Sequence, residues 1–180
     1  MWRRLIPIAL FLVLVIGVRV SGAEPPVGPR VIGATAWLVE GGSGARMLAR
    51  VDTGAASCSL HAEEILVPGG SEEMKANKGK KVRFRILDYA GESHWVESKI
   101  ASTVIVKNAE RRERRYKVWV DLVCHGVEKR VCVTLNDRTT MEYPALLGRN
   151  FLKGDFVVDV AQEATDLEPD EAKADNAGDA

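Results

Sequence analysis

Between residues 31 and 160, the apolar residues occur in short runs that are separated by glycine or charged residues. Residues 81–87 alternate strictly, so that apolar and basic side chains would face opposite sides of a strand. Glycine-rich segments such as residues 41–44 would supply the turns. Short strands at this spacing predict an all-β chain that forms a closed or nearly closed barrel. The expected strands are residues 31–39, 47–52, 81–87, 95–106, 117–123, 129–135 and 156–160.

Helical patterns are few in this sequence. Pro144 disfavours a helix through residues 141–147, because proline lacks the backbone N–H that a helix interior needs. Residues 150–153 and 59–65 are the remaining candidates for a helical turn. We therefore expect one or two short helices at most.

The two ends of the chain differ in composition from the rest. Residues 1–23 combine a basic start, a short apolar run and small residues before the expected cleavage point, which predicts a signal peptide or an uncleaved N-terminal anchor. Residues 161–180 are acidic and poor in apolar side chains, a composition typical of a disordered tail. We therefore expect one domain at residues 24–160, in a protein that is exported to the periplasm or the extracellular space. It would contact the membrane only if the first segment stayed attached.

Charge and cysteine content exclude two further classes of protein. The chain has 25 basic and 25 acidic residues, which gives no electrostatic reason to expect a nucleic-acid partner. Its three cysteines, Cys58, Cys124 and Cys132, do not form the dense pattern of a disulfide scaffold. If residues 125–126 form a hairpin turn, Cys132 lies opposite Trp119 and not opposite Cys124, so we expect mostly buried or free thiols.

The segment Asp52-Thr53-Gly54-Ala55 follows an apolar stretch and would place a carboxylate on a tight loop at the end of a strand. Gly54 allows unusual backbone angles and the close approach of another chain or a substrate. The Thr53 hydroxyl can brace the loop by hydrogen bonding. A carboxylate held in this way can activate water if a second carboxylate shares its proton. Asp and Gly are also common turn residues, so this segment alone is equally compatible with an ordinary loop.

A second segment, residues 146–152, combines apolar pairs with a glycine and the polar pair Arg149-Asn150. Its order after Asp-Thr-Gly-Ala resembles that of the retropepsin-like aspartic peptidases. Residues 51–55, 59–62, 131–138 and 141–149 look closer still to a bacterial group of that family that is often labelled "ATP-dependent zinc protease". The resemblance extends over residues 31–160.

This resemblance implies a retropepsin-like closed β-barrel, the acid-protease fold, in which an apolar segment passes behind the catalytic loop. The catalytic loop residues would be Asp52, Thr53 and Gly54. The residues that support the site would be Ala55, Leu147, Gly148 and Arg149. Arg149 resembles an arginine that stabilises the fold or the dimer in this family, so we expect it to be structural.

A flap hairpin and a second chain complete the expected site. Tyr89, Ala90 and Gly91 lie at the tip of a predicted hairpin and are our candidates for a flap that excludes water on closing. The chain contains one Asp-Thr-Gly segment, so an aspartic dyad requires a second copy of Asp52 across a two-fold axis. We expect a homodimeric aspartic endopeptidase that cleaves peptides or proteins without a cofactor.

The words "zinc" and "ATP" in the family label find no support in this sequence. His61, His94 and His125 lack the His-Glu-x-x-His spacing, and residues 41–44 do not continue into a phosphate-binding loop. We therefore predict no metal site. Two alternatives stay open: a domain of this fold that binds peptides or an envelope partner without cleaving them, and a metal-dependent hydrolase.

Overall fold

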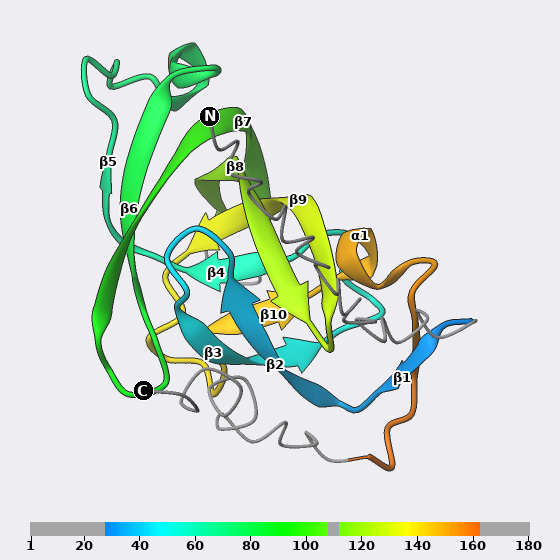
Figure 1. Ribbon diagram of the computed structural model, residues 1–180. Coiled ribbons are helices and arrows are strands. Elements are labelled where there is room, and N and C mark those ends of the chain that lie inside the picture. The colour runs from blue at the N-terminus through cyan, green and yellow to red at the C-terminus, as the bar shows by residue number, and fades with distance from the viewer. Residues whose placement is uncertain (1–27, 108–111, 163–180) are drawn as a thin grey trace, which may run out of the picture.

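The computed structural model describes residues 28–107 and 112–162, and within these residues it is nearly all β (Figure 1). The predicted signal segment lies outside the described residues, as does nearly all of the predicted tail. No helix in the described ranges is long and apolar enough to cross a membrane. The strands are β1 Arg30–Ile32, β2 Thr35–Glu40, β3 Arg46–Val51, β4 Ser59–His61, β5 Glu63–Leu66, β6 Lys81–Leu87, β7 Ser93–Lys107, β8 Arg112–Cys124, β9 Val127–Asn136, β10 Ala145–Leu147 and β11 Phe156–Val158. The helices are the 3-10 helix η1 Met74–Asn77 and α1 Arg149–Leu152.

Nine of the described strands form one sheet that partly closes on itself. Their order is β2-β3-β10-β4-β9-β8-β7-β6-β5, and β2 also pairs with β8. The strands β2, β3, β10, β4, β9 and β8 therefore form a ring, and β7, β6 and β5 extend the sheet beyond it. The all-β prediction is confirmed, with a ring of strands in the place of the expected barrel.

Alternation along the strands fills the interior of this sheet. Every second residue points inward, because successive side chains of a strand face opposite sides. Burying each large apolar side chain, from valine to phenylalanine, contributes about 1.5–3 kcal/mol to the free energy of unfolding. The buried residues include Ala36 and Leu38 on β2, Val82, Phe84 and Ile86 on β6, and Val118, Val120 and Leu122 on β8.

Several local predictions are confirmed and one is wrong. Residues 149–152 form the short helix expected near 150–153, and the turn at residues 125–126 places Trp119 opposite Cys132. All three cysteines are free thiols. Residues 59–65 are not a helical turn: they contain β4 and the start of β5. The reason is tertiary, because β4 lies between β9 and β10 and pairs with both.

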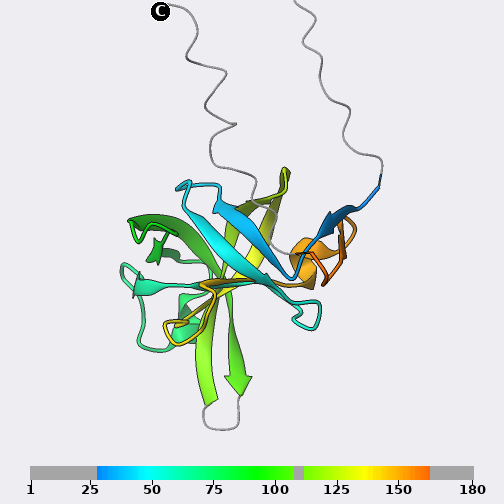
Figure 2. The same cartoon turned by 90° about the horizontal axis from the view of Figure 1, so that it is seen from below.

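Two parts of the described chain stand apart from the ring. The strands β1 and β11 form a separate two-stranded parallel sheet, in which Val31 lies opposite Val157. The hairpin of β7 and β8 extends away from the ring on another side, as Figure 2 shows. The predicted run 31–39 is therefore divided into β1 and β2, whereas residues 95–106 belong to one long strand.

Candidate active site

The loop of residues 52–55, here called the Asp52 loop, begins where β3 ends. β3 runs parallel to β10, with Val51 opposite Leu147. The pairing continues one residue further, because the Asp52 amide donates to the Leu147 carbonyl at 2.9 Å. The two segments that the sequence singled out are therefore in direct contact.

The carboxylate of Asp52 is held by its own loop. Its Oδ1 accepts hydrogen bonds from the amides of Gly54 at 2.8 Å and Ala55 at 3.1 Å. Asp52 is half-buried, whereas Thr53 and Gly54 are exposed in the single chain. Backbone donors fix the orientation of the carboxylate, and the exposed neighbours leave room for a further chain or a substrate.

Gly148 allows the second segment to pass directly behind this loop. A Cβ atom at position 148 would lie 2.6 Å from the carbonyl carbon of Ser57 and 3.0 Å from the Ala55 oxygen. Real Cβ atoms do not approach backbone atoms so closely. The Arg149 amide then donates to the Ala55 carbonyl at 2.9 Å. Glycine is required here because of this close approach.

Arg149 braces the outer side of the Asp52 loop. Its Nη1 donates to the carbonyl oxygens of Thr53 at 3.0 Å and Gly54 at 2.6 Å. Arg149 is exposed and reaches no carboxylate within ion-pair distance among the described residues. The Arg149 side chain therefore contacts the loop through the loop's carbonyl groups.

Sequence reasoning missed Cys58 and Asn150 as parts of this support. Asn150 Oδ1 accepts from the Cys58 amide at 2.9 Å, and Asn150 Nδ2 donates to the Cys132 carbonyl at 2.9 Å. The Cys58 Sγ accepts from the Gly148 amide at 3.3 Å. Burial raises the pKa of the Cys58 thiol to about 11, so this side chain is a thiol and not a thiolate at neutral pH. Only the position of Asn150 beside Arg149 could have indicated its role.

The turn of Tyr89, Ala90 and Gly91, our candidate flap, lies beside the start of β3, at the end opposite to Asp52. The Tyr89 amide donates to the Arg46 carbonyl at 2.8 Å, and the Tyr89 ring packs edge-on against Trp37 at 5.5 Å. Arg46 begins β3 and Asp52 follows its end, roughly 20 Å away at the usual rise per residue. This turn therefore does not cover Asp52 of its own chain. The sequence pattern identified the hairpin correctly but could not show which end of β3 it contacts.

The same turn contains a group of possible metal ligands. The ligand atoms of Asp88, Glu92 and His94 all lie within 4.8 Å of one another. Asp88 is already bonded: Oδ1 accepts from the amides of Ala90 and Glu92, and Oδ2 lies 2.8 Å from His94 Nε2. The His94 hydrogen bond is the largest cause of the lowered pKa of Asp88. These hydrogen bonds stabilise the turn between β6 and β7. The turn lies at the end of β3 opposite to Asp52.

A largely apolar cavity of about 580 Å³ adjoins the Asp52 loop. It connects the loop to α1 and β11, the strand that pairs with β1. Its walls expose apolar side chains beside the predicted catalytic residues. The lining residues are Thr53, Arg149, Leu152, Lys153, Phe156 and Val158.

Comparisons with known proteins identify the family and the fold. The family described as "RimB-like: Retropepsin-like aspartic endopeptidase RimB" matches residues 31–169. A crystal structure of a protein of unknown function from Legionella pneumophila is similar, with 26% sequence identity and a TM-score of 0.60. That similarity covers 75% of this chain and 96% of the Legionella chain. A search of curated proteins finds no match.

Proposed function

Because the chain belongs to the RimB-like family of retropepsin-like aspartic endopeptidases, we propose that it cleaves peptide bonds with a pair of Asp52 carboxylates, one from each of two copies. The observation that carries this proposal is the Asp52 carboxylate, which two backbone amides orient on a loop with exposed neighbours. A carboxylate oriented in this way can activate water once a second carboxylate shares its proton.

The chemistry needs two carboxylates that share one proton. Two such groups about 3 Å apart cannot both ionise readily, so one acts as a base and the other as an acid. The base removes a proton from water as the water oxygen bonds to the carbonyl carbon of the peptide. The acid protonates the carbonyl oxygen. When the tetrahedral intermediate collapses, the C–N bond breaks and the leaving nitrogen takes up a proton.

The second carboxylate is expected from another copy of the chain. The sequence contains a single Asp-Thr-Gly segment. Two features support pairing on the side of β1 and β11. Their two-stranded sheet has open edges in the described chain, and such a small sheet is marginal by itself. Its opposed residues Val31 and Val157 are 47% and 54% exposed.

The largely apolar cavity beside Thr53 supports the same pairing. Phe156 and Val158 of β11 line this cavity together with Thr53 and Arg149. A partner that covered β11 would therefore bury apolar surface next to the Asp52 loop, and two-fold symmetry would bring the two loops together. The peptidase site would then form only in the dimer.

The first test is digestion of a peptide library across a range of pH. Asp52→Asn keeps the shape of the side chain but removes the acid–base function, so we expect peptidase activity to fall by at least about a hundredfold, since acid–base catalysis contributes about 10²–10⁴-fold. Glu128→Gln, which removes an exposed carboxylate on β9, is the matched control and should retain activity. Full activity in Asp52→Asn would exclude the dyad.

Inhibitors separate this proposal from the metal-dependent alternative. A pepstatin-type inhibitor should block the activity, and a chelator should leave it unchanged. Loss of activity with the chelator, regained on adding zinc, would support a metal-dependent hydrolase. We also propose that residues 1–23 direct export, which fractionation of cells that express the full chain would test. Recovery of the protein only in the cytoplasm would contradict export.

A further inference from the structure

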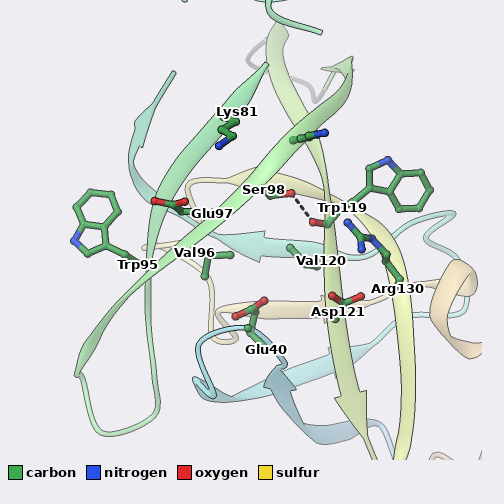
Figure 3. Close-up of a pocket in the computed structure, with 12 residues that line it drawn as sticks. Glu40, Lys81, Trp95, Val96, Glu97, Ser98, Trp119, Val120, Asp121 and Arg130 are labelled. Carbon is green, nitrogen blue, oxygen red and sulfur yellow. Dashed lines mark hydrogen bonds between the residues drawn. The ribbon is translucent and has the colours of Figure 1, made fainter. Parts of the chain in front are cut away.

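A second cavity, of about 560 Å³, lies where β7 and β8 separate. The two strands are paired from Ile100 and Val118 to the far end of their hairpin. Figure 3 shows that they diverge beyond Ser98, whose hydroxyl donates to the Trp119 carbonyl at 2.5 Å. We call this cavity the β7–β8 groove; Trp95, Val96, Trp119 and Val120 are among its walls. Glu40, at the end of β2 remote from the Asp52 loop, also lines it.

The edge of β7 that faces this groove lacks a strand partner. Ile100 bonds toward β6, since its amide donates to Lys80 and its carbonyl accepts from Gly79. Backbone groups of a strand alternate between its two edges, so Trp95 and Glu97 direct theirs away from β6. In the described chain, residues 93–99 of β7 pair with β6 alone. An extended polypeptide can add to such an edge as a further strand.

Glu40 places a buried carboxylate in the wall of the groove. The residue is 2% exposed, and its Oε2 accepts from the amide and the hydroxyl of Ser43, both at 2.7 Å. No cation of the described chain lies within ion-pair distance of this carboxylate. A buried carboxylate is stabilised by a cationic partner, and the groove gives such a partner access from solvent.

Other charges near this end of the groove have opposite charges beside them. Glu97 forms an ion pair with Arg83 at 3.1 Å. Asp121 lies opposite Arg130 in the pairing of β8 with β9, although the two side chains form no ion pair within 4.0 Å. Glu40 lies opposite Leu122 in the pairing of β2 with β8 and forms no ion pair with a described residue, which favours a cationic group in the occupant.

The rim of the groove carries partly exposed aromatic side chains and two lysines. Trp95 and Trp119 are 40% and 45% exposed, and Figure 3 shows their rings on the outer sides of β7 and β8, with Arg83 over the Trp95 ring at 4.9 Å from its centroid. Lys81 and Lys99 lie opposite each other on β6 and β7. Lys81 is at the other end of the groove from Glu40 (Figure 3), so it does not compete for the Glu40 carboxylate.

We propose that the β7–β8 groove binds an extended polypeptide that adds a strand to the free edge of β7 and places a lysine or arginine side chain on the carboxylate of Glu40. This binding site is separate from the Asp52 loop and does not require Asp52 to be catalytic. Recognition combines backbone hydrogen bonds, which are indifferent to sequence, with one charge-specific contact.

Fluorescence anisotropy tests this binding in the full chain carrying Asp52→Asn, which prevents cleavage of the probe. The probes are three labelled, threonine-rich decapeptides that differ only in a central lysine, norleucine or glutamate. We expect the lysine peptide to bind at least about tenfold more tightly than the norleucine peptide, and the glutamate peptide to bind most weakly. Adding Glu40→Gln should abolish this preference, because the amide oxygen still accepts from Ser43 but carries no charge.

Two further variants test the free edge of β7, and they do so even if Glu40→Gln does not fold. Glu97→Pro removes a backbone N–H on the free edge, where proline is tolerated, and should weaken all three peptides. Glu97→Ala retains that N–H and should bind as before. Equal affinities for the three peptides, a preference for the glutamate peptide, or unchanged binding in a folded Glu40→Gln variant would each overturn the proposal. Unchanged binding in Glu97→Pro would overturn the added strand.

Discussion

At the scale of single residues, the shape of the Asp52 loop depends on the absence of a side chain at Gly148. A Cβ atom there would lie 2.6 Å from the carbonyl carbon of Ser57, a backbone atom that cannot turn away. We predict that Gly148→Ala lowers the free energy of unfolding by about 1–3 kcal/mol, as overpacking does, and also lowers activity. Gly42→Ala is the control. A Cβ atom at position 42 would lie 3.3 Å from its nearest neighbour, Glu40 Oε1, which is the end of a side chain and not a backbone atom. Urea unfolding measures this free energy for both variants. Equal values for Gly148→Ala and Gly42→Ala would contradict the requirement for glycine at position 148.

The three thiols make a second prediction at this scale. Burial raises the pKa of Cys58 to about 11 and that of Cys124 to about 12, whereas Cys132 is half-exposed. Thiolates are the reactive form, so at pH 8 we expect Cys132 to react with a thiol reagent well before the other two. Mass spectrometry of the labelled peptides would identify the modified residue. Early labelling of Cys58 would show that the segment around Cys58, Gly148 and Asn150 opens readily to solvent.

At the scale of strands and loops, the sequence predicted what local patterns determine. The alternation in residues 81–87 and the turn at 125–126 gave β6 and the β8–β9 hairpin in the correct register. The short strand β4 was missed, because its three residues are ordered by pairing with β9 and β10 on either side. The sequence also did not show where the turn at residues 89–91 lies relative to Asp52. Which end of β3 the β6–β7 turn contacts depends on tertiary packing that no local pattern contains.

The sheet of β1 and β11 provides the prediction that belongs to this scale. Val157→Lys would place two like charges near the expected two-fold contact, so we expect the dimer dissociation constant to rise by about tenfold or more, which corresponds to about 1.4 kcal/mol. Activity per chain should fall in parallel at low protein concentration. Ile65→Lys, at an exposed apolar position on β5, is the control. Sedimentation equilibrium that shows the same association for both variants would exclude this face as the interface.

At the scale of the whole molecule, the two sites lie at opposite ends of β3. The Asp52 loop and the apolar cavity beside it adjoin β11, whereas the β7–β8 groove adjoins Glu40 near the β2–β3 turn. Pairing through β1 and β11 would therefore leave the groove accessible in each copy. The sequence indicated the need for a second chain, because one Asp-Thr-Gly segment supplies half of a dyad. It did not indicate the groove, which arises from two strands that separate.

The most direct test of the shared active site is the activity of mixed dimers. Equal amounts of wild-type and Asp52→Asn chains are combined, and the subunits are exchanged at fixed total concentration. If both Asp52 carboxylates are required, random pairing leaves roughly one quarter of the all-wild-type activity. A mixture with Glu128→Gln in place of Asp52→Asn should retain full activity. Activity that falls only to one half would show that each chain works alone, which would contradict a site formed by two copies.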